Sequence, residues 1–499
     1  MAQYKTPGVY IKENNSFPSS VVEVPTAVPA FLGYTARAQR GSEDVTGVPV
    51  RISNHAEYLA VFGEAPARRF AMSRTGTGDV FFTPVGQRFY LDLAMRMFFD
   101  NGGNACWIVS LGEFEAESYG AADASDAIWE ALAKETEPTA YVMPDAVALT
   151  REDHRKITER MMQECQKLQD RMAIIDVYDG RLPAGGSTEE FDWPAKAING
   201  ESGFRAIDLG DNPSYGTAYF PWLATNLSSS SDVSFVMLDA ASRETLSGLI
   251  KAEFTPEGGS LEAEIATYLA ELTRADLTEA ETTRVHRGFL SISPTYKTAI
   301  EALTDEINIV PPSGAMAGVW SRTDANIGVW KAPANTGIVG AMAPAITISD
   351  NEQENLNIPL DGKAINAIRS FLGRGILVWG ARTLNGNSQD WRYVNVRRTM
   401  IMLEQSIENA AAAYVFEPNE AGTWLAVKTM IENFLTNQWK AGALAGTTAE
   451  EAYQVSVGLG STMTGNDILD GYMRITVRVA VTRPAEFIEI TFQQKMQTS

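Results

Sequence analysis

The chain has few of the residues that build most chemical sites. Its 499 residues contain two cysteines, Cys106 and Cys165, and three histidines, His55, His154 and His286. Two thiols this far apart in the sequence fit a reducing compartment better than a disulfide scaffold. No histidine has a second histidine or cysteine at ligand spacing, and the one within a run of charged residues, at position 154, is expected to be solvated. We therefore expect no catalytic constellation, no metal and no cofactor.

Long apolar runs and an excess of positive charge are also absent. No stretch of about eighteen apolar residues occurs, so no direct membrane insertion is expected. Asp and Glu number 62 against 41 Lys and Arg, which gives a net charge of −21. Such a surface repels nucleic acid, which makes a nucleic-acid-binding function a poor candidate. The opening residues form no apolar signal region, so we expect synthesis in the cytoplasm.

Three weak motifs could be mistaken for chemistry. Gly458 to Gly465 lacks the third glycine of a dinucleotide fingerprint and the Lys-Ser/Thr of a P-loop, so a turn is predicted. Asp176 and Asp179 lie at the end of a predicted strand and could bind a metal, but no third ligand is identifiable, and an exposed loop is expected. Ser214-Tyr215-Gly216 does not form a nucleophile elbow. A structural or interaction protein is favoured over an enzyme.

The patterns that are present indicate a multidomain chain of the α/β class, in the sense of a mixed α+β arrangement, because 499 residues exceed one hydrophobic core. Strands are predicted at 21–24, 30–32, 106–109, 139–143, 173–177, 218–222 and 375–380. Helices are predicted at 55–62, 89–99, 123–134, 151–172 and 362–371, and residues 241–287 show helical periodicity with a break at 258–260. We divide the chain into an arm at 1–20, a core α/β part at 21–110, a large insertion at 111–354, a C-terminal domain at 355–482 and a terminal arm strand at 483–499.

A helical hairpin is predicted within the C-terminal domain. The apolar stripe of its first helix comprises Val396, Met400, Leu403, Ile407 and Tyr414. The opposite face carries Arg397, Arg398, Glu404 and Glu408, and it is expected to be solvated or to face a partner. The second helix runs from about Ala421 to Lys440 and ends at Gly442 as its C-cap.

Both ends of the chain carry a strand beside a chain breaker. Tyr472 to Val481 alternates apolar and polar residues, and Pro484 then interrupts the backbone ladder. A second run places Ile488, Ile490 and Phe492 on one side and Phe487, Glu489 and Thr491 on the other. The N-terminal arm holds a short strand from Tyr4 to Ile11. Each strand either folds back onto its own sheet or adds to the sheet of another chain.

Several stretches together resemble the contractile tail sheath family, which covers phage tails, tailocins and extracellular contractile injection systems. The stretches that match, in family order, are Thr6-Pro7-Gly8-Val9-Tyr10-Ile11, Val329-Trp330-Lys331-Ala332-Pro333-Ala334-Asn335, Arg374 to Leu384, Val394-Asn395-Val396-Arg397-Arg398, Phe416-Glu417-Pro418-Asn419 and Pro484-Ala485-Glu486-Phe487-Ile488. They cover residues 1–35 and 305–495 well and residues 111–300 weakly, as a variable outer decoration would. The opening is similar to sheaths of extracellular injection systems.

The resemblance implies a non-enzymatic subunit that stacks in hexameric rings around an inner tube and contracts to drive the tube into a target cell envelope. The implied partners are further copies of the chain, the inner tube protein, baseplate and terminal cap proteins, and paralogous sheath subunits. The chain would be made in the bacterial cytoplasm and end in a phage tail-like particle. A phage tail or tailocin sheath remains the nearest alternative, followed by a baseplate component or an α/β enzyme.

Two sets of residues receive roles from this resemblance. The arm strands that would exchange between neighbouring subunits contain Tyr4, Val9, Tyr10, Ile11, Glu486, Phe487, Ile488, Ile490 and Phe492. The candidates for facing the tube are the cations clustered near the helical hairpin, Arg392, Arg397, Arg398, Lys428 and Lys440. The alternative is that these cations pair with Glu404, Glu408 and Glu432 on the same helices.

Overall fold

The computed structural model of the chain describes residues 20–114, 119–186, 191–255, 261–489. The N-terminal arm strand from Tyr4 to Ile11, together with Ile490 and Phe492, lies outside the described residues. The chain divides into two compact units. One, the large unit, comprises residues 26–398, and the other, the terminal unit, combines residues 1–25 with residues 399–499. Each is described by itself.

A nine-stranded sheet forms the centre of the large unit, in the order β13-β16-β15-β10-β9-β8-β1-β7-β4. Neighbouring strands from β15 to β7 pair parallel, whereas β4, β16 and β13 pair antiparallel at the two edges. The strands are β1 (Pro29–Thr35), β4 (Val50–Ile52), β7 (Cys106–Glu113), β8 (Ala140–Val142), β9 (Met172–Asp176), β10 (Gly216–Phe220), β13 (Thr336–Gly337), β15 (Asn366–Phe371) and β16 (Gly375–Val378). Parallel strands connected through helices are typical of an α/β fold covered on both faces.

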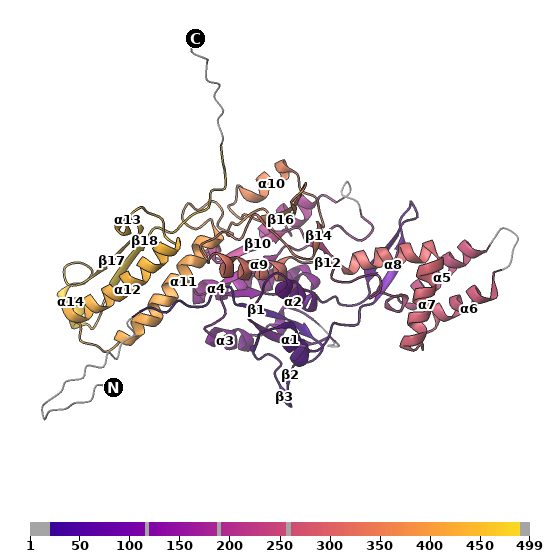
Figure 1. The fold of residues 1–499 in the computed structure, drawn as a ribbon, viewed down its shortest axis with the longest axis horizontal. Helices are drawn as coiled ribbons and strands as arrows, with labels where there is room; N and C mark the ends of the chain where they lie inside the picture. The colour runs from indigo at the N-terminus through magenta and orange to yellow at the C-terminus, as the bar shows by residue number, and fades with distance from the viewer. Residues whose placement is uncertain (1–19, 115–118, 187–190, 256–260, 490–499) are drawn as a thin grey trace, which may run out of the picture. The chain divides into compact units, whose positions relative to one another are not determined.

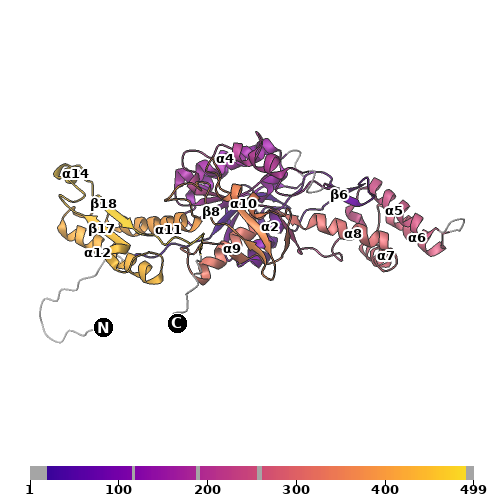
Figure 2. The same ribbon diagram turned by 90° about the horizontal axis from the view of Figure 1, so that it is seen from above.

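Helices cover both faces of this sheet, with α4 (Arg151–Leu168) on one side and α9 (Ser313–Asn326) on the other (Figure 2). α9 packs tightly on α2 (Leu91–Asp100), because a Cβ at Gly318 would lie 2.4 Å from the carbonyl oxygen of Phe98. The chain turns after α2 at a glycine, since Gly102 has a left-handed φ of +97°. The remaining elements near the sheet are α1 (His55–Phe62), α3 (Asp126–Lys134), α10 (Asp350–Asn357), the hairpin β2 (Gln39–Arg40) and β3 (Glu43–Asp44), and a small sheet of β12 (Ile309–Val310), β11 (Leu223–Thr225) and β14 (Ala341–Pro344).

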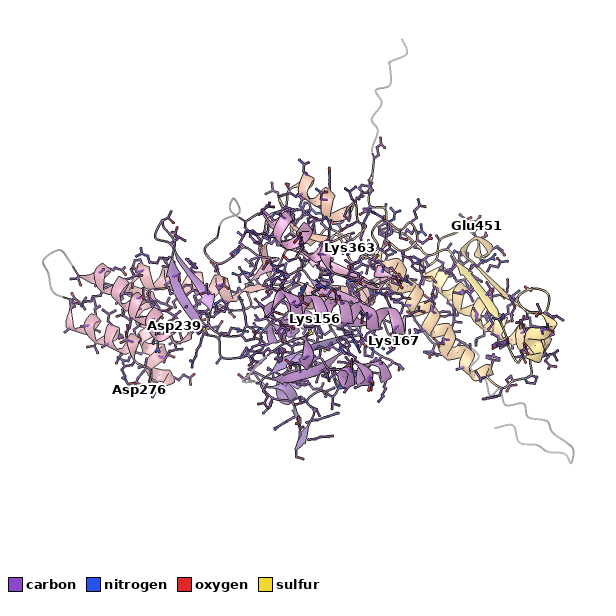
Figure 3. The ribbon with its side chains drawn as sticks, turned by 180° about the vertical axis from the view of Figure 1, so that it is seen from behind. Lys156, Lys167, Asp239, Asp276, Lys363 and Glu451 are labelled. Carbon is purple, nitrogen blue, oxygen red and sulfur yellow. The ribbon has the colours of Figure 1, made fainter. Side chains whose placement is uncertain are left out.

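A second hydrophobic cluster forms a helical part of the large unit. It joins the hairpin β5 (Phe70–Arg74) and β6 (Val80–Pro84) to α5 (Ala240–Phe254), α6 (Ala263–Thr273), α7 (Glu279–Ile292) and α8 (Pro294–Ile307). Phe70 and Phe82 of the hairpin are buried against Leu246, Phe289 and Tyr296 of the helices. Figure 1 shows these helices gathered together, and Asp239 and Asp276 mark the same part in Figure 3. The helical periodicity predicted for 241–287 is confirmed.

The sheet crosses the predicted boundary at residue 110. Strands β8, β9 and β10, which fall in the predicted insertion, lie between β1 and β15 in the same sheet. That boundary therefore does not separate two folding units. The predicted strand at 21–24 is also wrong, because these residues form no strand and the N–H of Val24 donates instead to Oγ of Ser406.

The helix predicted at 362–371 is wrong as well. Residues Asn366–Phe371 form β15, which pairs parallel with β10 and antiparallel with β16. The run from Ala364 to Ile368 is buried without interruption, and a short apolar run of this kind fits a central strand as well as a helix. Pairing on both sides decides between the two, because it satisfies backbone groups that a lone helical turn would leave unpaired.

The terminal unit joins sequence from both ends of the chain. Its helices are α11 (Val394–Ala411), which begins in the large unit, α12 (Ala421–Ala441), α13 (Ala449–Ala452) and α14 (Gly465–Leu469), and its strands are β17 (Tyr453–Val457) and β18 (Ile475–Val479). The predicted helical hairpin is confirmed, and Gly442 caps α12 with a left-handed φ of 95°. The segment at residues 20–25 is held on this unit, since Nε2 of Gln438 donates to Oε2 of Glu23 over 2.9 Å.

Candidate assembly surface

The sheet of the terminal unit has only two strands within the described part of the chain. β17 and β18 pair antiparallel, with Val455 opposite Val477 and Val457 opposite Ile475. These apolar residues are buried or partly buried, while Thr476 and Arg478 between them are exposed, as the period-two pattern of β18 predicts. α12 packs against β17. Because β17 and β18 pair only with each other here, both outer edges of the sheet keep backbone groups that can accept a further strand.

The chain after β18 leaves this sheet. Thr482 still donates its N–H to the carbonyl of Ala443 over 3.1 Å, and Pro484 follows. Residues 483–489 form no strand, and Phe487 and Ile488 are 72% and 79% exposed. The described part of the predicted arm thus presents two exposed apolar side chains beyond its own sheet.

Two of the candidate tube-facing cations are inside the large unit. Arg397 is 3% exposed, donates through Nη2 to Oγ of Ser214 over 2.6 Å, and stacks 3.6 Å from the ring centre of Trp391. Arg398 is 6% exposed and lies 4.4 Å from the ring centre of Trp320. The prediction that this face of α11 is solvated is therefore wrong for both arginines. Planar guanidinium groups that stack on aromatic rings tolerate burial, and a sequence pattern alone does not reveal the rings.

The other three cations are more accessible. Arg392 is partly buried and donates through Nε to the carbonyl of Ser388 over 2.9 Å. Lys428 lies 3.7 Å from Glu432 on the same face of α12, as the alternative reading of these cations requires, and its side chain is 41% exposed. Lys440, in the last turn of α12, is exposed. Exposed pairs of this kind are weak, so these lysines remain available to a partner.

The residues considered for chemistry serve the core instead. His154 is 2% exposed, contrary to the predicted solvated position, and its Nε2 lies 3.0 Å from the carbonyl oxygen of Asp176. Burial lowers the pKa of His154 to about 4. Asp176 is 4% exposed, so the prediction of an exposed loop is wrong for this residue, and its Oδ1 accepts the N–H of Ser313 over 2.8 Å. Burial raises the pKa of Asp176 to about 7.

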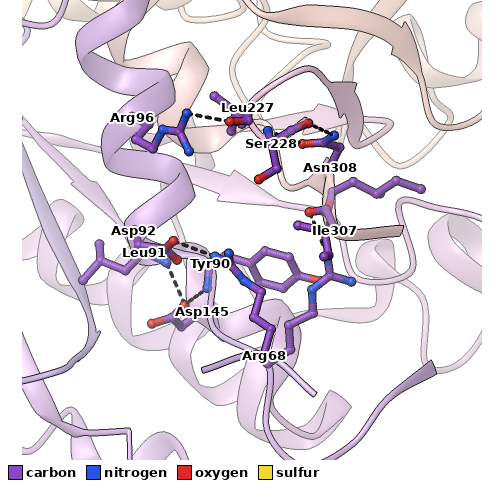
Figure 4. A network of polar contacts seen from close by, with 12 residues as sticks. Arg68, Tyr90, Leu91, Asp92, Arg96, Asp145, Leu227, Ser228, Ile307 and Asn308 are labelled. Carbon is purple, nitrogen blue, oxygen red and sulfur yellow. Dashed lines mark hydrogen bonds and ion pairs between the residues drawn. The ribbon is translucent and has the colours of Figure 1, made fainter. Parts of the chain in front are cut away.

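Two buried carboxylates that the sequence did not reveal hold the large unit together, Asp145 within the sheet part and Glu306 between that part and α8. Asp145 is buried and accepts the backbone N–H groups of Tyr34, Tyr90 and Leu91 at 2.8, 2.5 and 3.0 Å, and burial raises its pKa to about 7. Figure 4 shows Asp145 beside Tyr90 and Leu91. Glu306 of α8 accepts from Arg88 over 2.8 Å and from Arg181 over 2.7 Å. These contacts are structural, because each carboxylate uses its oxygens on the protein itself.

Neither a metal site nor a membrane span is found in the described ranges. No group of three or more His, Cys, Asp or Glu side chains there could hold a metal ion. None of the helices that the structure resolves combines the length and apolar content needed to cross a bilayer. The glycine-rich stretch at 458–465 is a turn, since the N–H of Gly460 bonds to the carbonyl of Met463 and the N–H of Thr462 to that of Gly458.

Comparison with known proteins gives the class. The phage tail sheath protein central domain matches residues 260–384, and the phage tail sheath C-terminal domain matches residues 387–495. The tail sheath protein of Vibrio phage KVP40 is 29% identical over 156 residues, which is 31% of this chain and 23% of that protein. The chain thus aligns with less than a quarter of that curated relative.

Solved structures match the chain over nearly its whole length. The PVC sheath of an extracellular contractile injection system, in its contracted state, is 25% identical, covers 99% of both chains and has a TM-score of 0.60. The contracted helical sheath of the anti-feeding prophage is 26% identical, covers 99% of this chain and 100% of that one, and has a TM-score of 0.63. The fold and these matches define a structural protein rather than an enzyme. The chain is therefore similar to the contractile tail sheath family in both matched domains and in its full-length fold.

Proposed function

We propose that this chain is the sheath subunit of an extracellular contractile injection particle. Copies stack as six-membered rings around an inner tube, and contraction of the sheath drives that tube through a target cell envelope. The full-length likeness to the contracted PVC and anti-feeding prophage sheaths supports this reading. A chain in the six-fold symmetrised baseplate of the anti-feeding prophage is 26% identical over 99% of this chain. The nearest alternative is the sheath of a phage tail or tailocin, which the relative from Vibrio phage KVP40 favours.

One observation carries the proposal that neighbours exchange strands. Within the described residues, the two-stranded sheet of the terminal unit has open edges, and the segment that follows it at 483–489, with exposed Phe487 and Ile488, lies outside that sheet. Addition of a strand uses backbone hydrogen bonds for affinity and alternate side chains for register. We therefore propose that Glu486 to Phe492 of one copy, and Tyr4 to Ile11 of another, complete the sheet of a neighbour. Each fully buried Ile or Phe would contribute about 1.5–3 kcal/mol.

The other partners follow from the same proposal. The inner tube lies inside the rings, the baseplate and a terminal cap close the ends, and paralogous sheath subunits can occupy the same lattice. The tube-facing candidates that remain are Arg392, Lys428 and Lys440. The helical part formed by β5, β6 and α5–α8 is proposed to lie on the outside of the particle, because its helices carry wide charged faces. We propose that the chain is synthesised in the cytoplasm before it assembles into the particle.

The test is a chain that ends at Thr482. This variant removes the arm and leaves β18 and its pairing with β17 intact, so it should fold and keep its helical circular dichroism. It should fail to form striated cylinders in negative-stain electron microscopy. The double substitution Ile488→Asp with Ile490→Asp should act in the same way, because it places two charges on the apolar side of the arm.

Thr491→Asp is the matched control, since alternation places residue 491 on the opposite side of the arm. It should assemble normally. Cylinders of ordinary length from the chain that ends at Thr482 would show that the arm is not required between neighbours. A full-length chain that stays monodisperse under every assembly condition would instead count against the sheath function itself.

A further inference from the structure

The turn between α11 and α12 presents an aromatic side chain that the described chain leaves uncovered. Phe416 is 102% exposed, and Val415 before it is 61% exposed. Phe416 also has a φ of +72°, in the left-handed region that bulky residues rarely adopt. Because the side chain is exposed, no burial energy offsets its unfavourable backbone conformation. Positions of this kind persist only where the surroundings fix them, and they concentrate at functional sites.

The surroundings do fix this turn. The N–H of Glu417 bonds to the carbonyl of Tyr414 over 3.2 Å. Asn419 donates through Nδ2 to the carbonyl of Tyr472 over 2.9 Å and accepts from Nε1 of Trp424 over 2.7 Å. The turn is therefore a rigid projection rather than a loose loop. We call Phe416, with the exposed carboxylates of Glu417 and Glu420 beside it, the knob.

A hollow of about 560 Å³ in the large unit has the complementary character. Its apolar walls include Pro66, Pro84, Phe89 and Phe114. Its charged lining comprises Arg68, Arg69, Arg88 and Glu113, so cations outnumber anions. The walls suit an aromatic ring, and the arginines suit carboxylates that arrive with it. We call this hollow the socket.

The socket also contains unused hydrogen-bond donors. Nη2 of Arg68 pairs with Asp92 over 2.6 Å, but among the described residues Nε of Arg68 and Nε of Arg88 are buried without an acceptor. The side chain of Arg88 is 9% exposed. Buried donors of this kind normally have partners, and their absence is costly. The accessible cation of the lining is Arg69, which is exposed.

We propose that the knob of one copy of this chain docks in the socket of a second copy, with Phe416 against the apolar walls and Glu417 or Glu420 toward Arg68 and Arg69. This inference rests on the proposed sheath function. The two surfaces belong to different units and are not self-complementary, so the contact is heterologous. Heterologous contacts propagate into rings or helical arrays rather than closing as a dimer.

The test uses disulfide cross-linking, for which the chain is well suited because its native thiols, Cys106 and Cys165, are both buried. Full-length Phe416→Cys and full-length Ala67→Cys, the latter at an exposed position in the socket lining, are mixed, assembled into cylinders and oxidised. A covalent dimer that forms from the mixture, and from neither variant alone, is expected. Leu360→Cys, which replaces another fully exposed apolar side chain, is mixed with Ala67→Cys as the control and should give no dimer.

A charge exchange gives a second readout that does not depend on oxidation. Glu417→Arg should reduce the yield of cylinders at least severalfold, and addition of Arg69→Glu to the same chain should restore it. Cylinders that form without the cross-link, or without sensitivity to Glu417→Arg, would overturn the docking proposal and leave the sheath function standing. A cross-link from Phe416→Cys to a co-assembled tube protein would also overturn it. Absence of any cylinders from the unmodified chain would count against the sheath function.

Discussion

Arg398 and Asp324 form a buried ion pair between α11 and α9, with Nη1 of Arg398 2.9 Å from Oδ1 of Asp324. Their side chains are 5% and 8% exposed. Arg398 belongs to the last residues of the large unit, so this pair fixes the start of a helix whose later turns belong to the terminal unit. Arg398, which the sequence analysis proposed as a contact to the tube, thus holds α11 to α9 of its own chain.

Removal of one member of this pair should destabilise the large unit strongly. Arg398→Ala leaves the carboxylate of Asp324 buried without a counter-charge, and the expected loss in the free energy of unfolding is about 3–5 kcal/mol. The double variant Arg398→Met with Asp324→Leu should recover most of that loss, because apolar side chains of similar size fill the space. Urea denaturation followed by circular dichroism measures both. Glu301→Ala, which breaks the exposed Lys297–Glu301 pair at 3.9 Å, is the control and should cost less than about 1 kcal/mol. Equal losses from Glu301→Ala and Arg398→Ala would contradict the argument.

Stability should depend on pH through the buried carboxyl group of Asp176. Its pKa rises from 3.8 to about 7 on folding, so between these values the folded state holds more protons than the unfolded state. Its contribution is fully present below about pH 4 and is lost as the pH rises through 7, by up to about 1.4 kcal/mol per pH unit. His154, which bonds to the carbonyl of Asp176, acts in the opposite direction between pH 4 and 6.5, because burial lowers its pKa to about 4.

Asp176→Asn separates these contributions. An asparagine there can still accept the N–H of Ser313 but does not titrate. The difference in unfolding free energy between the native chain and this variant should shrink as the pH rises from 4 to 7 and then stay constant. The urea midpoints of the native chain and of Asp176→Asn, measured at four pH values in that range, test this expectation. A difference that grows with pH would mean that Asp176 is stabilised as the anion.

The accessible lysines of α12 provide a test of the proposed tube face. Lys428→Glu with Lys440→Glu should reduce assembly on a purified inner tube, and the native assembly should weaken as salt rises, because exposed charges are screened within about 8 Å at physiological ionic strength. Sedimentation of tube-bound protein measures both effects. Lys297→Glu, another lysine that pairs with a glutamate four residues on, is the control in the helical part. Unchanged tube binding by the double variant would remove these lysines from the interface.

The helical part should accept an insertion without loss of assembly. Complete deletion of residues 242–287 would expose to solvent the side chains that share a hydrophobic core with them, among them Phe70, Phe82 and Tyr296. A hexahistidine tag inserted between Gly258 and Gly259 avoids this problem. Cylinders of normal length that bind nickel–gold particles along their outer surface are expected. A tag that blocks polymerisation while the subunit still folds would place this segment in the lattice.

The sequence predicts the elements whose pattern is local. The alternation of β18 and the glycine cap of α12 at Gly442 each follow from neighbouring residues alone. The sequence does not predict elements and side-chain positions that depend on contacts with residues far away in the chain. β15 becomes a strand because β10 and β16 flank it, and the positions of Arg397 and His154 depend on Trp391 and Asp176, which the spacing of charges does not reveal.

The features of the candidate assembly surface likewise fall into those that local sequence predicts and those that it does not. The break at Pro484 and the apolar side of the arm can be read from the sequence, since period two and proline chemistry are local properties. The open edges of the sheet formed by β17 and β18 cannot be read, because they depend on which strands fail to pair. The strained exposure of Phe416 is likewise invisible in the sequence, although the motif that contains it, Phe416 to Asn419, is one of the stretches that carry the family resemblance.

The bond between the N–H of Val24 and Oγ of Ser406 joins residues 382 positions apart. During synthesis, the segment that carries Val24 must therefore wait for its site on α11, which at about 5–20 residues per second takes about 20–80 s. The large unit, which is continuous in sequence, can fold within that interval. The order of translation thus makes the terminal unit the last to close, and a nascent chain acquires the sheet edges that its neighbours would use only after its larger core is complete.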